Sequence, residues 1–479
     1  MTYTYGNLIG GSWRDTPATL ETFNPARPAQ QVGRYSLADE SLVTEAVAAA
    51  MKAQRQWAKL PAAQRCEALA RYIDRIETRK EELAQAITAE QGKALTESRG
   101  EVTKACAESR FMLQHVMSGE GSRHVPPLRA GVRNMVVRRP RGIIVAITPW
   151  NFPVMTPMRK IAPALGFGNA LIVKPSEFTP AAACLLGELA AGLLPDGLFQ
   201  VIHGGADVGN ALVSHPGVQG VTFTGSVSTG RRIVAATAAN LAEVSLELGG
   251  KNAAVIHDAS DLDACLDQVA SAALMCSGQR CTAVSRVLVR RELHGEVAAG
   301  LAKRASAMRL GDGAQPATQL GPITHRAQLE HVKAAVRQAS ADGAEVLAGG
   351  AETQIDGCEG GYFFAPTVLD GVRADSAAAR EEIFGPVISI IEYETLDEAI
   401  GILNGVEFGL TAAFFSDDAK AISRFVDECQ TGMLHVNHGT VPDSHMPFGG
   451  IKASGVGAYS VGPSAAVFYT TEHSIYLGA

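Results

Sequence analysis

The feature that most constrains the fold is a regular alternation of short apolar segments with helical segments, which begins at residue 142. The apolar runs are rich in Ile, Val, Leu and Phe, and the stretches between them carry helical periodicity. Buried strands separated by helices predict a parallel sheet built from βαβ units. The expected strands are Ile143–Ile147, Ala170–Val173, Phe199–Ile202, Gly220–Phe223 and Val244–Leu248, and helices are expected near 156–166, 180–193, 206–214 and 228–239.

The regions on either side of this alternation predict a larger, two-lobed molecule. Apolar residues recur at helical spacing over 39–59, 64–91 and 97–118, which predicts amphipathic helices. A second α/β pattern runs from 253 to 437. Since the chain has 479 residues, too many for one small core, we expect two α/β lobes.

An exposed ribbon is also expected. Residues 133–139 alternate after a Pro-Pro break, and the segment 463–479 holds a strand-like run from Val467. We expect this run to pair with the ribbon or with another subunit. Arginines cluster in the same region, and such a cluster can grip phosphate, although a solvated or subunit-facing strand is the favoured interpretation. They are Arg129, Arg133, Arg138, Arg139 and Arg141.

Composition argues against several classes of function. The formal net charge of −7 gives no reason to expect nucleic acid or an anionic membrane as partner. No apolar run reaches about 18 residues, the length that predicts a membrane span. The 8 cysteines are scattered without a Cys-x-x-Cys pair, and the N-terminus lacks a basic region followed by an apolar one. We therefore expect free thiols in the cytoplasm.

Residues with polar or ionisable side chains follow the predicted strands. In parallel sheets, ligands bind at these carboxyl ends of the strands. The Asn151 amide can donate to an oxyanion, or the residue can simply shape a turn before proline. Glu247 can act as a general base, although taken alone a solvated strand-end glutamate is the favoured interpretation. The stretch 223–230 is the best phosphate-turn candidate, with an ordinary βα turn as the alternative.

A cysteine among small and polar residues is the candidate nucleophile. Cys281 follows a predicted helix over 261–275. A free thiol titrates near pH 8.5, so a reactive one needs a helix end, a base or oxyanion donors nearby; the alternative is a small buried hydrophobe. Cys276 admits a regulatory disulfide with it, but a buried thiol is favoured.

A metal site is not predicted. The histidines near the C-terminus have a spacing that can chelate zinc, but no cysteine or carboxylate cluster completes the set. A substrate-facing or structural position suits them better. They are His435, His438 and His445.

Taken together, motifs in seven places resemble the NAD(P)-dependent aldehyde dehydrogenase superfamily over nearly the whole chain, and they occur in the family's order. The resemblance implies two Rossmann-type α/β lobes and a small β oligomerisation ribbon. It assigns 1–121 and 141–249 to cofactor binding, 250–445 to catalysis, and 122–140 with 463–479 to oligomerisation. The motifs are Pro149–Pro153, Lys174–Glu177, Phe223–Ser226, Glu247–Lys251, Gly278–Cys281, Glu382–Pro386 and Pro447–Gly450.

The resemblance also implies a mechanism. Cys281 would attack the aldehyde, and the Asn151 amide with the Cys281 backbone N–H would hold the oxyanion of the thiohemiacetal. Hydride would pass to the nicotinamide and leave a thioester. Glu247 would activate the water that hydrolyses it to the free acid, which argues against the CoA-acylating relatives that lack this glutamate.

Cofactor contacts are implied by matched position. Lys174 and Glu177 would bind the adenine ribose hydroxyls. Because Glu177 would repel a 2′-phosphate, we expect NAD to be preferred, with NADP possible. The remaining contacts are expected at Ile147, Trp150, Gly225, Ser226, Leu248, Glu382 and Phe384.

The substrate is expected to be a semialdehyde with a terminal acid, such as succinate or 2-oxoglutarate semialdehyde. Arg159 stands where many family members have tryptophan and can clamp a carboxylate bidentately; the alternative is a surface arginine. Met275 replaces a second arginine of some succinate-semialdehyde enzymes, and Arg280 is expected to compensate. Phe448 is expected to contact the substrate as well.

Other functions stay open at this point. The enzyme can instead oxidise a neutral aliphatic or aromatic aldehyde. A catalytically retired relative that serves as a structural or binding protein is disfavoured, because nucleophile, base, oxyanion donor and cofactor contacts are all present. The resemblance further implies a homo-oligomer, either a dimer or a tetramer.

Overall fold

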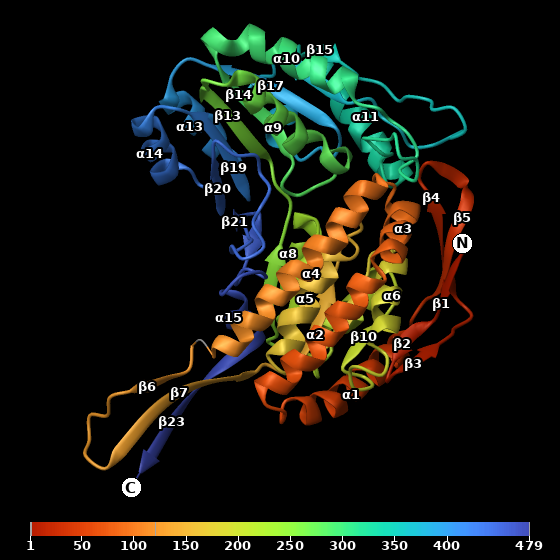
Figure 1. Cartoon of the computed structure of the whole chain (residues 1–479), viewed down its shortest axis with the longest axis vertical. Coiled ribbons are helices and arrows are strands. Elements are labelled where there is room, and N and C mark those ends of the chain that lie inside the picture. The colour runs from red at the N-terminus through yellow and green to blue at the C-terminus, as the bar shows by residue number, and fades with distance from the viewer. Residues whose placement is uncertain (1, 120, 479) are drawn as a thin grey trace.

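The structure, a computed structural model, describes residues 2–119 and 121–478; Met1 and Glu120 of the predicted cofactor segment 1–121 and Ala479 of the predicted oligomerisation segment 463–479 lie outside the described residues. Two large sheets organise the chain, with an eight-stranded sheet in the lower lobe of Figure 1 and a seven-stranded sheet in the upper lobe. A cavity that is lined by residues of both lobes lies where the lobes meet.

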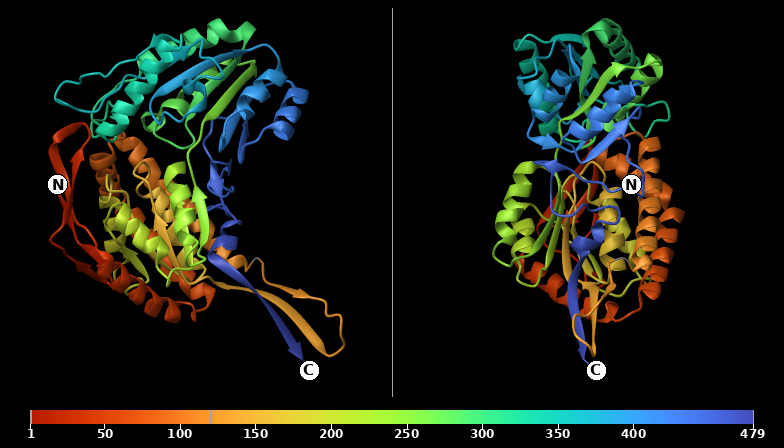
Figure 2. Two further views of the ribbon diagram at one scale, coloured as in Figure 1. Left: turned by 180° about the vertical axis from the view of Figure 1, so that it is seen from behind. Right: turned by 90° about the vertical axis from the view of Figure 1, so that its left-hand side faces the viewer.

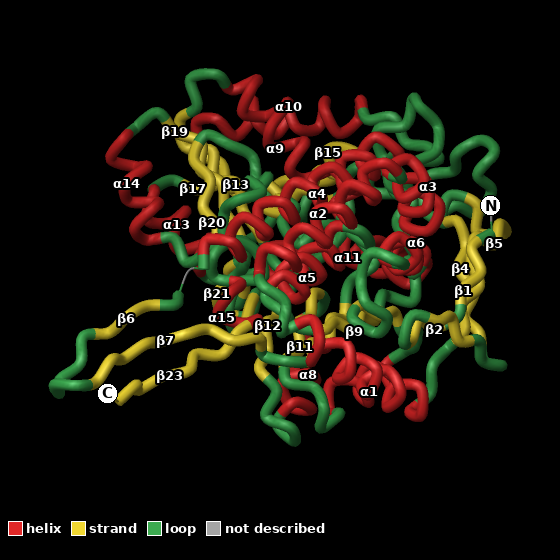
Figure 3. Tube along the Cα trace, turned by 60° about the horizontal axis from the view of Figure 1, so that its bottom comes forward, coloured by secondary structure: helices red, strands yellow, loops and turns green. Residues whose placement is uncertain are grey.

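The alternation that begins at residue 142 forms the parallel centre of the first sheet, as predicted. Its strands are almost entirely buried because helices pack against them. Figure 3 shows these strands between α1 and α8 on one side and α2, α4 and α5 on the other. In spatial order the strands are β22 (Gly455–Val456), β12 (Glu243–Glu247), β11 (Gly220–Thr224), β8 (Ile143–Ile147), β9 (Ala170–Lys174), β10 (Phe199–Val201), β2 (Asn7–Ile9) and β3 (Ser12–Arg14).

The helices of this lobe follow the apolar periodicity. Asp39 caps α1 by accepting a hydrogen bond from the Leu42 N–H, and the buried residues of α1 recur every three or four positions. The helices are α1 (Glu40–Trp57), α2 (Ala62–Thr78), α3 (Lys80–Gln91), α4 (Leu95–Ser118), α5 (Met155–Gly166), α6 (Ala181–Ala190), α7 (Ala206–Ser214) and α8 (Val227–Thr237).

One predicted helix is wrong in its extent. The segment 64–91 is not continuous, because Arg79 adopts a non-helical backbone (φ −104°, ψ 19°) that ends α2 and begins α3. Apolar spacing continues across the break, since α2 and α3 both pack on α4. The periodicity therefore could not reveal the change of direction.

The second α/β pattern forms the seven-stranded sheet, in the order β15 (Glu345–Ala348), β16 (Thr367–Asp370), β17 (Val387–Tyr393), β14 (Val284–Arg290), β13 (Asn252–Asp258), β19 (Thr411–Ser416) and β20 (Met433–Val436). All its neighbouring pairs are parallel except β15 with β16. The helices are α9 (Leu262–Leu274), α10 (His294–Ala307), α11 (Arg326–Ala341), α12 (Ala377–Arg380), α13 (Leu396–Asn404) and α14 (Ala419–Glu428), with 3₁₀ turns η1 (Met275–Gly278) and η2 (Arg291–Leu293).

Smaller sheets complete the chain. Near the N-terminus β1 (Tyr3–Tyr5), β5 (Arg27–Ser36) and β4 (Thr19–Asn24) form a three-stranded sheet, and β18 (Phe408–Gly409) pairs with β21 (Ile451–Lys452). A ribbon of β6 (Arg123–Val125), β7 (Val132–Pro140) and β23 (Thr470–Gly478) projects from the body, as both views in Figure 2 show. The predicted pairing of the C-terminal segment with the ribbon is confirmed, since β23 runs antiparallel to β7.

The predicted strand start at Val467 is wrong. Residues Ala465–Tyr469 form the short helix α15, and the strand begins only at Thr470. Phe468 and Tyr469 are buried in the core of the first lobe, so this turn anchors the ribbon to the body. In the part of the chain that the structure describes, every helix is too short or too polar to cross a membrane.

Candidate active site

A cavity of about 780 Å³ lies at the carboxyl ends of the parallel strands of the first lobe and is lined by residues from both lobes. Its size suits a cofactor together with a small substrate. Asn151 follows β8, Ser226 follows β11 and Glu247 ends β12, so parallel strands deliver all three side chains to one edge. Cys281 reaches the same cavity from the second lobe.

The segment before Cys281 has an unusual backbone. After α9 ends, Cys276 (φ +57°), Ser277 (φ +55°) and Gly278 (φ +67°) are successively left-handed. Such conformations cost non-glycine residues free energy and are tolerated where the surroundings fix them. A Cβ at residue 278 would overlap the Gly385 carbonyl, so only glycine lets these two segments pack together. This strained turn aims the following residues into the cavity.

Gln279 fixes the turn. Its side-chain Oε1 accepts a hydrogen bond from the Thr324 N–H (2.9 Å), and its Nε2 donates to the Cys276 carbonyl (3.2 Å). Its own carbonyl accepts a bond from Asn151 Nδ2 at 2.8 Å. That contact assigns the amide orientation, because a flipped Asn151 would place two oxygens together. The second N–H of Nδ2 remains for a ligand in the cavity.

Glu247 is buried with one open oxygen. Oε1 accepts a long bond from the Ser460 N–H (3.5 Å), whereas Oε2 has no hydrogen-bond partner among the described residues. Burial raises the pKa of Glu247, and Lys160 opposes that shift. Such a carboxyl is suited to accepting a proton near neutral pH.

Lys160 is a cavity residue for which the sequence indicated no role. It is fully buried on α5, and its Nζ has no partner among the described residues. Burial lowers its pKa, while Glu247 raises it. The sequence could have indicated a role for Lys160, because it follows Arg159 directly. Two consecutive cations on a buried helix are costly unless anionic or polar groups lie near them.

Burial disfavours the thiolate form of Cys281. Burial raises its pKa to about 11, and Arg159 and Arg280 are the groups that act in the opposite direction. Its predicted partners Asn151 and Glu247 line the same cavity. The predicted nucleophile, oxyanion donor and base are therefore brought together.

Predicted cofactor residues line the same cavity toward the start of α8. Ser226 caps this helix by accepting a bond from the Thr229 N–H, and Gly225 precedes it. Glu382 accepts a bond from the Gly250 N–H (3.0 Å), and burial raises its pKa to about 7. A helix start with small residues and an inward carboxylate fits a dinucleotide with pyrophosphate and ribose hydroxyl groups. Trp150, Leu248 and Phe384 line the cavity as well, and the Trp150 and Phe384 rings meet edge to face, 5.4 Å apart.

Three predicted cofactor residues lie beside the cavity wall instead. Lys174 Nζ donates to the Gly204 carbonyl (2.5 Å) and lies 3.5 Å from Glu177 Oε1. The Glu177 side chain is 39% exposed, so its carboxylate can meet a ligand. Ile147 and Lys174 flank Gly209 on α7, where a Cβ would contact both side chains.

The predicted substrate residues Arg159, Arg280 and Phe448 also line the cavity. Arg159 donates from Nε and Nη2 to the two Glu108 oxygens (2.6 and 2.9 Å), and its guanidinium lies 4.4 Å from the Phe448 ring centre. The bidentate edge assigned to a substrate carboxylate is therefore occupied by Glu108. Arg280 Nη2 donates to the Ala272 carbonyl (2.6 Å), and its Nε has no partner among the described residues.

Glu108 and Lys104 were missed in the sequence. They stand one turn apart on α4, and Lys104 lines the cavity. Burial lowers the pKa of Lys104, Glu108 opposes that shift, and Arg159 and Arg280 lower the pKa further. The i, i+4 spacing of the two residues was a signal for a shared face, but not for what that face meets.

Comparisons with known proteins place this site in context. The model of the aldehyde dehydrogenase family matches residues 13–475. The chain is 34% identical to the alpha-ketoglutaric semialdehyde dehydrogenase of Bacillus subtilis, over 99% of this chain and 98% of the relative. It is 35% identical to the mitochondrial succinate-semialdehyde dehydrogenase of Arabidopsis thaliana, over 94% and 85%. The solved structure of 3,6-anhydro-L-galactose dehydrogenase in complex with NAP, the NADP cofactor, superposes with a TM-score of 0.96 at 33% identity, over 99% of this chain and 100% of that one.

Proposed function

The chain belongs to the aldehyde dehydrogenase family and is an NAD(P)-dependent oxidoreductase that acts on aldehydes, and from this premise we propose that it oxidises a semialdehyde with a terminal carboxylate to the free diacid. The observation that carries the proposal is the group of cations at one end of the cavity that holds Cys281. Lys104, Arg159 and Arg280 all line that end.

The charge balance at this end favours an anion. Glu108 pairs with Arg159 through two hydrogen bonds and also lies 4.0 Å from Lys104, so one carboxylate serves two cations, and Arg280 adds a third positive charge. An excess of positive charge in a partly buried site is costly. A substrate carboxylate would offset that cost, whereas a cationic aldehyde would add to it. The two semialdehyde dehydrogenase relatives support the same class.

In the proposed reaction Cys281 forms the covalent bond. The Cys281 thiol gives its proton to solvent, and the thiolate, favoured by Arg159 and Arg280, attacks the aldehyde carbon; the Asn151 amide with the Cys281 backbone N–H stabilises the oxyanion. When bound, the nicotinamide ring supplies the two-electron acceptor chemistry for this carbon. Gly225, Ser226 and Glu382 would hold the cofactor.

Hydrolysis of the resulting thioester is assigned to Glu247. A buried carboxylate with an open oxygen and a raised pKa can take a proton from water as the water attacks. The thiolate of Cys281 then leaves and takes up the proton held by Glu247, and the acid is released. In the proposed division, the cofactor lobe (1–121 and 141–249) carries Gly225 and Ser226, and the catalytic lobe (250–445) carries the nucleophile Cys281.

A substrate screen tests the proposal directly. NADH formation is measured with succinate, glutarate and 2-oxoglutarate semialdehydes and with betaine, aliphatic and aromatic aldehydes. We expect kcat/KM to be highest for one of the acid-bearing substrates. A higher value for a neutral aldehyde would reject the substrate class and leave the oxidoreductase activity intact.

Arg159→Ala examines the cationic end. We expect KM for succinate semialdehyde to rise by about 10-fold to 100-fold, because the site loses one positive charge and the unpaired Glu108 carboxylate would repel the carboxylate of the substrate. KM for butanal, a neutral aldehyde of similar length, should change little. Equal changes for both substrates would show that Arg159 serves only to hold Glu108.

Glu177 is proposed to favour NAD. Its exposed carboxylate, 3.5 Å from Lys174, would repel a 2′-phosphate. Glu177→Gln should raise kcat/KM for NADP several-fold and leave the value for NAD within about twofold, since an exposed charge pair contributes only about 1 kcal/mol. Equal efficiency of the unmodified enzyme with both cofactors would contradict this preference.

Assembly and compartment are proposed from two further observations. The ribbon at 122–140 and 463–479 carries exposed Leu128 and Tyr476 away from the body, so we propose that it pairs with another subunit in a dimer or tetramer. Light scattering of the intact protein measures this directly. All 8 cysteines are free thiols, which suits the cytoplasm.

A further inference from the structure

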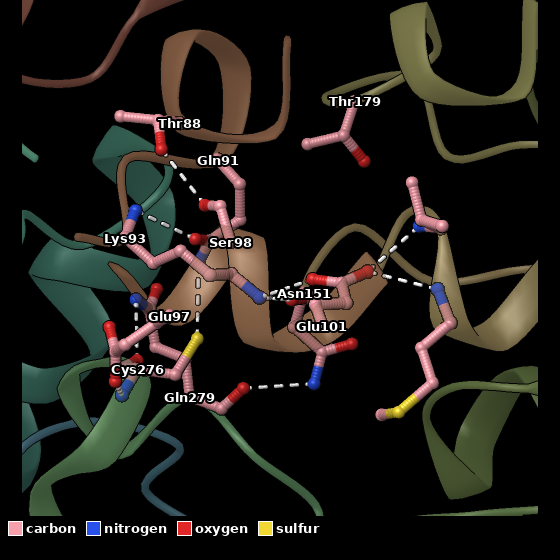
Figure 4. A network of polar contacts seen from close by, with 12 residues as sticks. Thr88, Gln91, Lys93, Glu97, Ser98, Glu101, Asn151, Thr179, Cys276 and Gln279 are labelled. Atoms are coloured by element: carbon pink, nitrogen blue, oxygen red, sulfur yellow. Dashed lines mark hydrogen bonds and ion pairs between the residues drawn. The ribbon is translucent and has the colours of Figure 1, made fainter. Parts of the chain in front are cut away.

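The turn that carries Asn151 is held by Lys93, which comes from the connection between α3 and α4. Gly92 (φ +96°) ends α3, and Lys93 enters the interior directly after it. Lys93 Nζ donates to the Asn151 carbonyl at 2.6 Å and to Glu101 Oε2 at 2.8 Å (Figure 4). The ammonium also lies 4.0 Å from the Phe152 ring centre. Three contacts therefore fix one buried cation against residues 151 and 152.

Glu101 completes this arrangement. Its Oε1 accepts hydrogen bonds from the Val154 N–H (2.8 Å) and the Met155 N–H (3.0 Å). These are N–H groups at the start of α5, a helix that has no capping side chain of its own. A carboxylate from α4 thus caps α5. Lys93 therefore binds the carbonyl at the start of the 151–155 turn, and Glu101 binds the N–H groups at its end.

Burial makes this pair costly unless it is fully satisfied. Both side chains are 1% exposed. Burial opposes the charge of Lys93, yet Cys276 and Glu101 hold its pKa above the usual value. Buried ion pairs contribute little to stability compared with apolar residues of similar volume, so a pair of this kind is weak as a stabilising device. Its partners identify a different use, because they are the backbone groups around Asn151.

We infer that Lys93 and Glu101 are positioning residues that hold the Asn151 amide where it stabilises the oxyanion formed on Cys281. Asn151 Nδ2 donates one of its two hydrogens to the Gln279 carbonyl. The direction in which the second N–H points therefore depends on the position of the Asn151 backbone. A displacement of about 1 Å at such a donor can cost about 100-fold in rate. The inference rests on the proposed roles of Cys281 and Asn151.

The test is a double-mutant cycle between Lys93→Met and Asn151→Ala. In the Asn151 background, Lys93→Met should lower kcat/KM for the preferred aldehyde by about 10-fold to 100-fold. In the Asn151→Ala background it should change kcat/KM by less than about threefold, because the positioned group is gone. Losses that multiply in full would overturn the inference.

Two companion variants guard against misfolding. Lys93→Met with Glu101→Gln leaves no unpaired buried charge, so it should fold and still lose the same factor, since the donor to the Asn151 carbonyl is missing. Wild-type turnover by this double variant would overturn the inference. Arg99→Met is the matched control: it breaks a 2.8 Å ion pair between α4 and Glu81 of α3 on the exposed surface, and Arg99 does not line the cavity. It should retain wild-type turnover, and a comparable loss there would assign the effect to helix packing.

Alkylation of Cys281 distinguishes a displaced Asn151 amide from a distorted loop around the nucleophile. Reaction with iodoacetamide forms no oxyanion, so its rate at Cys281, followed by peptide mass spectrometry, should be the same in Lys93→Met and wild type. A parallel loss of alkylation and turnover would show a distorted nucleophile loop and overturn the inference. Full activity of Asn151→Ala alone would instead reject the proposed oxyanion role, a failure distinct from that of the Lys93–Glu101 assignment.

Discussion

The two sides of the reaction cavity differ in how completely their polar atoms are bonded. On the oxyanion side, the Asn151 carbonyl, one N–H of its side-chain amide and the Val154 and Met155 N–H groups have partners, supplied by Lys93, Gln279 and Glu101. On the base side, Glu247 Oε2 and Lys160 Nζ are buried without partners among the described residues. The difference matches the chemistry: a group that must keep its geometry is bonded throughout, whereas a group that must exchange protons keeps an open position.

Removing the base should have the largest effect. Glu247→Gln keeps the size of the side chain but cannot accept a proton, so steady-state turnover should fall by about 10²- to 10⁴-fold. Acylation does not use this group, so a rapid burst of NADH should remain. Stopped-flow absorbance measures burst and steady state together. Equal loss of both phases would place Glu247 on the acylation step as well.

Removing the oxyanion donor should have the next largest effect and a different pattern. Asn151→Ala should lower kcat by about 10²- to 10³-fold, and burst and steady state should fall together, since both steps pass through an oxyanion on Cys281. The same stopped-flow experiment records this. An intact burst of NADH in Asn151→Ala would contradict the claim that Asn151 acts in acylation, whereas Glu247 acts only in deacylation.

Lys160→Met should have the smallest effect and should appear mainly in the pH profile. Lys160 lowers the pKa of Glu247, so its removal raises that pKa further above the ordinary carboxyl value of 4.5. The base must be ionised, so deacylation rises with pH, and its midpoint should move to higher pH in the variant. At any pH well below the midpoint, a midpoint that lies one pH unit higher makes the rate about tenfold lower. A midpoint that is unchanged or lower would mean that Lys160 does not act on Glu247.

The same variant also has an expectation for stability. Lys160→Met removes a buried cation without a hydrogen-bond partner among the described residues, so thermal unfolding should occur at an equal or higher temperature. A large drop in Tm would show that the ammonium has a structural partner in solution.

The sequence predicted the reacting groups better than their supports. Cys281, Asn151 and Glu247 could be found because each stands in a short motif near the end of a predicted strand or helix. Lys93 and Glu101 could not, because their partners are backbone groups more than fifty residues away and no periodicity marks such contacts. Arg159 shows the same limit: its residue type was informative, but Glu108 on another helix decides which of its donors are free.

The fold followed a similar rule. Apolar alternation predicted the parallel strands of the first lobe to within a few residues. It missed the break at Arg79, where the apolar pattern continues although the backbone turns. It also mistook Val467–Tyr469 for a strand, because buried aromatic residues suit either a strand or a short anchoring helix.

The most direct test of the proposed chemistry is to identify the covalent intermediate. The Glu247→Gln variant is mixed with NAD and succinate semialdehyde, and the reaction is quenched in acid. The protein is then digested, and the masses of the cysteine-containing peptides are measured by mass spectrometry. We predict one succinyl group on Cys281 and unmodified thiols at the other cysteines. An unmodified Cys281 during NADH formation, or an acyl group on another cysteine, would contradict the assignment of Cys281 as nucleophile and Glu247 as the base that releases the acid.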